Sequence, residues 1–298
     1  MARETSAPAA MSDTAESSQK TAMNVDKFIA DLLRDLKNNQ LELPTLPQVA
    51  VRISQVIDDP DSRAKEVAQI IGADPALSAR MIQVANSPLV RGDSKIDNLQ
   101  NAITRMGTTM VRNIVTSFLV KQLFRTEYKP LQQRMTDLWN HSAHVAAISH
   151  VLAVHFSTLK ADEVMLAGLL HDIGKLPILA KARKITNIEA NEKALDMILE
   201  KLHPALGKAI LQAWRFEADI VAAAADHENI NRNSKTLDHT DIVIIANLHS
   251  YMGKAHANKV DLETIPAMSK LSLDAEASLA VLKEAHSEIV EIQRLLSN

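Results

Sequence analysis

The sequence predicts an all-α protein made of two packed helical halves. Glycine is scarce, with 7 residues among 298, and aromatic residues make up only 3% of the chain. Strands are enriched in aromatic and β-branched residues, so a chain rich in Ala, Leu, Ile and Glu favours helices. Apolar residues also recur at intervals of three and four, which is typical of amphipathic helices.

The N-terminal half begins after a polar tail. Residues 1–25 are small and polar, and they contain no apolar run long enough for a signal-peptide core, so we expect a disordered tail. The apolar residues of 24–38 follow a helical stripe. Pro44 and Pro47 then interrupt helix formation, and Pro47 suits the first turn of a helix over 48–59.

Four more helices complete this half, which we delimit as residues 26–127. They are predicted over residues 64–74, 76–86, 99–107 and 109–124. Asp74 followed by Pro75 is typical of a helix N-cap with proline at the first helical position. Residues 86–98 are predicted to form a surface loop, in which Asn86, Ser87 and Pro88 end the preceding helix.

The charged stretch 125–133 is the predicted boundary, and a second helical half follows over residues 128–255. It opens with a long helix over 132–156 and continues into the motif LAGLLHDIGKLPIL at 166–179, where Pro177 should end or kink the helix. Later helices are predicted over residues 191–202, 204–214, 217–228 and 239–252. Residues 256–298 form a C-terminal extension, with one amphipathic helix over 273–297 capped by Asp274.

Composition narrows the classes of partner. The formal net charge of -3 gives no global basic field, so nucleic acid is not an expected partner. The longest apolar runs are too short to span a membrane, and a membrane is therefore not an expected partner. The absence of cysteine excludes disulfides and thiolate ligands, and it agrees with a cytoplasmic location.

Histidine is the unusual feature of the second half. The chain has 11 histidines, and His141, His171, His203 and His227 stand in helical segments of this half, with His171 directly before Asp172. Helices of a bundle can direct such side chains to one divalent ion. A single histidine on an apolar helix is more often a hydrogen-bonded core residue, so spacing alone leaves both interpretations open.

Several motifs carry a family resemblance. The order of His141, the HDIGK motif at 171–175, and then His203 and His227 resembles the HD superfamily of metal-dependent phosphohydrolases. The segments LPTLPQVAVRI at 43–53, DPDSRAKEVAQIIGADPALSARMIQVANSP at 59–88 and NLQNAITRMG at 98–107 resemble the HDOD family, the HD-related output domain of bacterial signalling proteins. The resemblance covers about residues 40–255 and implies an HD-like helical bundle in the second half.

The resemblance also implies roles for individual residues. Asp172 and Lys175 would be the catalytic residues, with Lys175 near bound phosphate. One or two divalent ions (Fe, Mn, Mg, Zn or Ni) would be the cofactor. The implied metal ligands are His141, His171, Asp172, His203, Asp226, His227 and Asn247.

Two positions depart from the HD pattern. Asn247 stands where HD enzymes have their last Asp ligand. A neutral amide binds a divalent ion more weakly than a carboxylate. Asp241 would be the last ligand instead if the alignment of this helix is shifted by six residues. Asp226 stands where two-metal cyclic-dinucleotide phosphodiesterases have a histidine. Their GYP signature is also absent, so hydrolysis of cyclic di-GMP is not expected.

Two functions follow as hypotheses. The favoured one is a stand-alone HDOD signal-transduction module with a degenerate or residual metal site, which binds a protein partner or a small phosphorylated ligand. The alternative is a metal-dependent phosphohydrolase acting on a nucleotide or other phosphoester.

Outside the site, Trp139 and Trp214 are predicted to be core or interface anchors. The basic residues Lys181, Arg183 and Lys184 are predicted to form a solvated surface.

Overall fold

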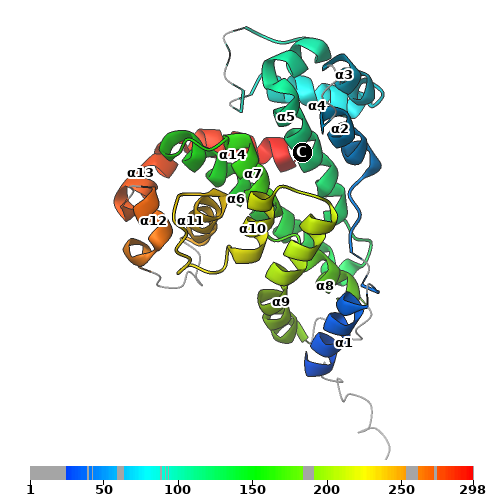
Figure 1. Cartoon of the computed structure of the whole chain (residues 1–298), viewed down its shortest axis with the longest axis vertical. Coiled ribbons are helices and arrows are strands. Elements are labelled where there is room, and N and C mark those ends of the chain that lie inside the picture. The colour runs from blue at the N-terminus through cyan, green and yellow to red at the C-terminus, as the bar shows by residue number, and fades with distance from the viewer. Residues whose placement is uncertain are drawn as a thin grey trace, which may run out of the picture.

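A computed structural model of the chain confirms the all-α prediction, and the residues it describes contain helices and turns but no strand (Figure 1). The structure describes residues 25–38, 40–41, 43–58, 64–87, 89–90, 92, 94–183, 191–252, 261–271 and 274–297. The predicted tail lies outside these ranges apart from Val25. None of the described helices is both long enough and apolar enough to cross a membrane.

The described residues of the N-terminal half form five helices and a short 3-10 turn. They are α1 (Val25–Lys37), α2 (Gln48–Asp58), α3 (Ala64–Gly72), α4 (Pro75–Ala85), α5 (Leu99–Val120) and η1 (Lys121–Phe124). As predicted, the Asp74 carboxylate caps α4 by accepting hydrogen bonds from the backbone of Ala76 and Leu77. Asn86 ends α4, and its side chain forms two hydrogen bonds with the backbone of Ile96, which closes the loop.

Gly107 separates the two helices that the sequence predicts within the segment labelled α5. The sequence predicts separate helices over 99–107 and 109–124, and the backbone of α5 leaves helical geometry between them, at Gly107, which confirms the break. The φ angle there is 75°, in the left-handed region that glycine adopts without a steric penalty. The kink lets the first part of α5 pack on α3 and α4 while the second part reaches α7.

The second half is a bundle around the long helix α6. Its helices are α6 (Lys129–Phe156), α7 (Ala161–Leu170), α8 (Lys175–Ala182), α9 (Glu192–Ala213), α10 (Ala218–Asp226) and α11 (His239–Tyr251). Helix α7 packs closely along α6, since a Cβ at Gly168 would lie 3.1 Å from the Ala146 backbone. Trp139 of α6 is buried and packs edge-on against Phe124, which confirms its predicted role as a core anchor.

Two predictions about proline are wrong. The helix of the HDIGK motif ends at Leu170, before Pro177, and Pro177 instead lies in the first turn of α8, where a backbone N–H has no helical acceptor. Pro204 does not separate two helices but lies inside α9. Burial of the apolar face of α9 in the core outweighs the roughly 3 kcal/mol that an internal proline costs.

The C-terminal extension packs on the second half. It contains η3 (Leu262–Thr264), α12 (Pro266–Lys270), α13 (Ala275–Glu284) and α14 (His286–Ser297). The predicted single helix over 273–297 is therefore wrong, because the chain leaves helical geometry at Ala285. Asp274 caps α13 as predicted, by accepting a hydrogen bond from the Ala277 backbone. Helix α14 lies along α6 (Figure 1).

The first helix joins the two halves. Helix α1 packs against α9 of the second half, away from α2–α5 (Figure 1). The Trp214 indole donates a hydrogen bond of 2.9 Å to the Pro44 carbonyl, which confirms Trp214 as an interface anchor. Lys181 forms an ion pair with Asp35 of α1, so the predicted solvated surface is wrong for Lys181. Arg183 is exposed as predicted, and Lys184 lies outside the described residues.

Candidate metal centre

The HDIGK motif forms a tight turn between α7 and α8. His171 and Asp172 are fully buried in this turn. Gly174 lets the turn approach α9, since a Cβ there would lie 1.9 Å from the His203 carbonyl oxygen and 2.4 Å from the Gly207 nitrogen. Any larger residue would collide with backbone atoms. The motif is therefore held directly against the helix that carries His203.

Three buried histidines share one orientation. Each ring places Nδ1 against a backbone carbonyl one helical turn earlier in the chain. The pairs are His171–Gly168 at 2.7 Å, His203–Leu199 at 2.7 Å and His227–Ala223 at 3.1 Å. A carbonyl oxygen can only accept, so Nδ1 carries the hydrogen in each ring. In the neutral form, every Nε2 then offers a lone pair, which is the usual arrangement of histidine ligands.

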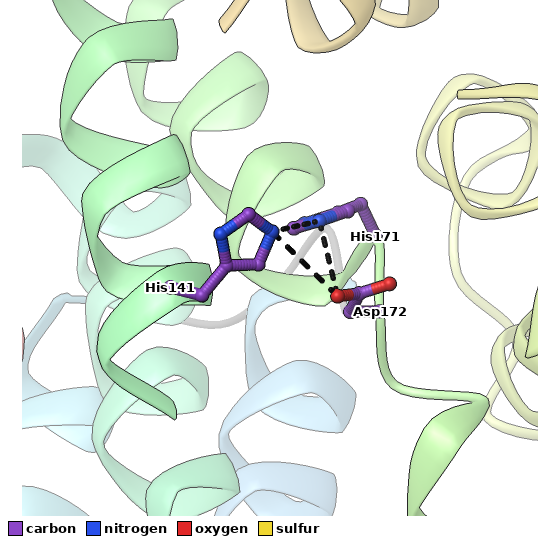
Figure 2. Close-up of side chains that lie close together, drawn as sticks. All are labelled: His141, His171 and Asp172. Atoms are coloured by element: carbon purple, nitrogen blue, oxygen red, sulfur yellow. Dashed lines mark hydrogen bonds and ion pairs between the residues drawn. The ribbon is translucent and has the colours of Figure 1, made fainter. Parts of the chain in front are cut away.

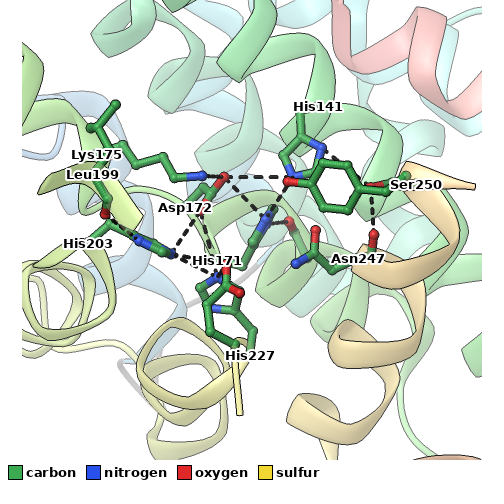
Figure 3. A network of polar contacts seen from close by, with 12 residues as sticks. His141, His171, Asp172, Lys175, Leu199, His203, His227, Asn247 and Ser250 are labelled. Carbon is green, nitrogen blue, oxygen red and sulfur yellow. Dashed lines mark hydrogen bonds and ion pairs between the residues drawn. The ribbon is translucent and has the colours of Figure 1, made fainter. Parts of the chain in front are cut away.

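These Nε2 atoms face one another in pairs. The Nε2 atoms of His141 and His171 lie 3.2 Å apart (Figure 2), and those of His203 and His227 lie 3.1 Å apart (Figure 3). Two facing lone pairs repel unless a proton or a metal ion lies between them. Nitrogen atoms that share one ion at a metal–nitrogen distance of about 2.0–2.1 Å are separated by roughly 3 Å. The spacing therefore suits ligands of a common ion.

Asp172 lies between the two histidine pairs. Its Oδ2 atom is 3.7 Å from Nε2 of His141 and 3.5 Å from Nε2 of His171. Its Oδ1 atom is 3.3 Å from Nε2 of His203 and 3.7 Å from Nε2 of His227 (Figure 3). Lys175 donates a hydrogen bond of 2.5 Å to Oδ2. Each carboxylate oxygen of Asp172 thus lies beside a different histidine pair.

Burial and charge set the protonation of this cluster. Burial raises the pKa of Asp172, but Lys175 and His171 lower it more, so its pKa lies well below the ordinary value and the carboxylate is ionised. Burial lowers the pKa of His171 well below its ordinary value and that of His203 to about 4. Burial also lowers the pKa of His227, but Asp172 and Glu228 raise it to about 9. At neutral pH His203 is therefore neutral and His227 is protonated, so the pair carries one positive charge.

The donors define two candidate ion positions that share Asp172. The first is formed by His141, His171 and Asp172, and the second by Asp172, His203 and His227; within each group the ligand atoms lie within 4.8 Å of one another. Imidazole nitrogens with a carboxylate suit first-row divalent ions. Two buried oxygens, Oδ1 of Asp172 and Oδ1 of Asn247, accept no hydrogen bond from the residues that the structure describes. The residues present therefore fit a divalent metal.

Comparison with known proteins decides the family. The HDOD domain family matches residues 43–230, which is more than half of the chain.

The chain belongs to the HDOD family.

Solved HDOD structures share its fold. A protein from Shewanella amazonensis SB2B, named as a candidate metal-dependent phosphohydrolase, is 30% identical, with a TM-score of 0.78 over 92% of this chain and 98% of that chain. An HDOD domain protein with unknown function from Geobacter sulfurreducens is 23% identical, with a TM-score of 0.62 over 92% of this chain and 99% of that chain. No protein with curated annotation matches this HDOD chain.

Two of the acidic residues considered for this HDOD site lie elsewhere. The Asp226 side chain is 51% exposed at the end of α10 and faces Arg232 at 3.9 Å, outside both candidate positions. Asp241 is buried, but it accepts hydrogen bonds from Arg232, Ser234 and Lys270 near the start of α11. The fallback alignment through Asp241 therefore brings no ligand to the site.

Glu228 is the carboxylate that the sequence analysis missed. Its Oε1 atom lies 3.6 Å from Nε2 of His203 and 3.5 Å from Nε2 of His227. The only signal in the sequence is its position directly after His227. Glu228 therefore occupies the place beside the second candidate ion that the sequence analysis gave to Asp226.

The sequence analysis also missed Tyr251, which lies beside the first candidate ion position. Tyr251 of α11 stacks on His141, with ring centroids 5.1 Å apart, and its hydroxyl lies 3.4 Å from Nε2 of His141. Burial raises the pKa of Tyr251, so the phenol keeps its proton. The Ser250 hydroxyl lies 3.5 Å from Nδ1 of His141. These contacts fix the ring of the least buried histidine in the cluster.

The HDOD site opens into a cavity of about 1050 Å³. Lys175, His203, His227, Glu228 and Asn247 all line it, so a ligand that fills the cavity reaches the second candidate position. Asn247 is 6% exposed, and its buried Oδ1 accepts no hydrogen bond from the part of the chain that the structure describes. The ligand role of Asn247 remains a prediction.

Proposed function

We propose that this HDOD protein is a metal-dependent phosphohydrolase acting on a phosphoester. The observation that carries the proposal is the buried Asp172 carboxylate, which presents one oxygen to each of two histidine pairs beside an open cavity. The name given to the Shewanella amazonensis protein, 30% identical over nearly its whole length, supports the same activity.

The residues have distinct roles in this proposal. His141, His171, His203 and His227 would hold one or two ions together with Asp172, and Glu228 and Asn247 would complete the ligands. A divalent ion bound there would supply a water of lowered pKa and neutralise phosphoryl charge. Lys175 lies at the cavity wall with its ammonium group 2.5 Å from Asp172, so it can also contact a phosphoryl oxygen. Asp172 would orient the attacking water through Oδ1.

A regulatory module is the second candidate, and two observations favour it. Lys175 already neutralises the buried Asp172 charge, so that carboxylate does not need a metal ion to balance it. Asn247 contributes a neutral amide where the HD pattern has a carboxylate. In this alternative the cluster keeps a structural role, and the protein acts by binding a protein partner or a small phosphorylated ligand.

Metal content and turnover test the proposal together. The full chain would be purified without chelator, its first-row metals quantified by mass spectrometry, and Mn, Fe, Ni, Zn or Mg added back separately. Hydrolysis of p-nitrophenyl phosphate and bis(p-nitrophenyl) phosphate would then be measured. We expect one or two ions per chain and metal-dependent turnover, and we expect Asp172→Asn to lose both.

Asp226→Asn is the matched control, since it makes the same change on an exposed carboxylate near the site. It should keep metal and turnover at the level of the unmodified chain. Retained metal without hydrolysis of either ester would count against the phosphohydrolase and favour the regulatory module. A chain that binds no metal even after reconstitution would contradict the proposed site itself.

A further inference from the structure

The walls of the site cavity are acidic. Glu192, Asp196 and Glu200 of α9 line it at intervals of four residues, which places them on one face of the helix. Asp137 of α6 also lines the cavity. These carboxylates belong to the same cavity as Lys175 and the second candidate ion position.

Few cations balance these carboxylates. Among the described residues that line the cavity, five are carboxylates and two, Arg134 and Lys175, are permanently cationic. Arg134 pairs with Asp196 at 2.5 Å, and Lys175 pairs with Asp172 at the inner end. Glu192, Glu200 and Asp137 therefore leave a net negative field along the outer wall.

The inner end of the cavity, at the second candidate ion position, would favour a negatively charged group instead of a positively charged one. Asn247 has a buried amide oxygen that accepts no hydrogen bond from the described residues, and Asn247, His203 and His227 all line this cavity. With divalent ions bound, this end would attract a phosphate group. The cavity is thus polarised, with a phosphate-binding end inside and an acidic wall outside.

We propose that the cavity selects a phosphoester that carries a single phosphate and, at its other end, a positively charged amine. The proposal rests on the proposed function, because the phosphate must bind beside the ions. The acidic wall of α9 attracts an ammonium group and repels any further phosphate or carboxylate of the ligand. Nucleoside triphosphates and other polyanions are poor ligands for such a cavity.

Three phosphonates of matched size test the proposal without depending on turnover, because a phosphohydrolase does not cleave their C–P bond. They are 2-aminoethylphosphonate, propylphosphonate and 3-phosphonopropionate, which end in an ammonium, a methyl and a carboxylate group. Their dissociation constants would be measured by calorimetry with the metal-loaded full chain. We expect the amine to bind roughly three- to tenfold more tightly than the propyl compound, as for a partly exposed ion pair, and the carboxylate to bind most weakly.

A double variant assigns the preference to the wall. Glu192→Gln combined with Glu200→Gln should bring the amine to the affinity of propylphosphonate and strengthen binding of 3-phosphonopropionate. Glu284→Gln on α13, an exposed carboxylate remote from the cavity, should change none of the three affinities. Equal affinities for all three compounds, tighter binding of the carboxylate, or no binding of any compound would overturn the proposal.

Hydrolysis of 2-aminoethyl phosphate and propyl phosphate separates this inference from the proposed function. Preferential binding of the amine without hydrolysis of either ester would contradict the phosphohydrolase and leave the ligand class standing. Hydrolysis of both esters at equal kcat/KM, with no preference in binding, would keep the phosphohydrolase and reject the ligand class.

Discussion

Among the proposed metal ligands, Asn247 is the one that would contribute a neutral amide oxygen. Asn247 lines the cavity, and its buried amide oxygen accepts no hydrogen bond from the described residues and carries no charge. An amide is a weaker ligand for a hard cation than a carboxylate, and the difference is larger inside the protein than in water.

We therefore expect Asn247→Asp to tighten metal binding by roughly tenfold, since a charge within a few ångströms of the ion contributes more than 1 kcal/mol. The measurement is competition for Mn or Zn against a chelator of known affinity. Asn101→Asp, at an exposed asparagine on α5 that does not line the cavity, is the control for added charge alone. Unchanged affinity in Asn247→Asp would show that Asn247 does not contact the ion.

Glu228 and Asp226 offer a direct comparison between neighbours. We expect Glu228→Gln to weaken the second ion roughly tenfold, because it removes the carboxylate beside His203 and His227. Asp226→Asn should leave the metal content unchanged, since its side chain faces Arg232. Metal content per chain after dialysis distinguishes the two. The reverse result would restore the sequence-based assignment of Asp226.

The contrast between these two residues shows how far the sequence could predict the site. His171 and Asp172 stand in an unbroken apolar segment, so their burial follows from the pattern alone. Glu228 lies just beyond the end of α10, where the helical period no longer fixes the direction of a side chain. Its approach to His203 depends on how α10 packs against α9, which one sequence does not reveal.

At the scale of elements, the turn at residues 171–174 and helix α9 form one unit. Gly174 is required there by its close approach to the backbone, not by its φ angle, which is -66°. To make room for a side chain, the turn would have to move away from the His203 carbonyl and the Gly207 nitrogen. The same movement would take Asp172 away from His203.

Gly174→Ala should therefore destabilise the protein by about 3 kcal/mol or more and also reduce its metal content, because added volume in a packed core displaces backbone. Gly72→Ala is the matched control, since a Cβ there would meet only Leu99 at an ordinary 3.7 Å. Chemical denaturation and metal analysis of both variants provide the check. A stable, fully loaded Gly174→Ala protein would contradict this account of the turn.

The sequence predicts that the elements are helices, but it does not predict where every helix begins and ends. Stripes of apolar residues indicated the helices, and Asp74 and Asp274 marked two of their starts. Pro204 was misleading because tertiary packing of α9 outweighs the local cost of proline. The break at Ala285 has no proline or glycine to mark it, so the sequence offered no local signal.

At the scale of the whole molecule, the candidate ligands come from separate segments. His141 lies on α6, His203 on α9 and His227 at the end of α10, while His171 and Asp172 lie in the turn after α7. A bound ion therefore links much of the second half, and it should stabilise the folded state as any ligand of the native protein does.

Metal saturation at about 100 times the dissociation constant should raise the free energy of unfolding by about 2.7 kcal/mol. That gain corresponds to a rise in Tm of roughly 5 °C for a chain of this size. Thermal unfolding with and without a chelator gives the measurement. Asp172→Asn should show no metal-dependent rise, and an equal rise in this variant would place the stabilising ion elsewhere.

The shared carboxylate has a thermodynamic consequence for the pair of ions. Because Oδ1 and Oδ2 of Asp172 belong to the same group, the first ion to bind withdraws negative charge from the position of the second. The two binding constants are therefore linked, and each ion changes the affinity for the other by the same factor. A titration of this centre should show two unequal steps, with a form that holds a single ion populated between the empty and the full states.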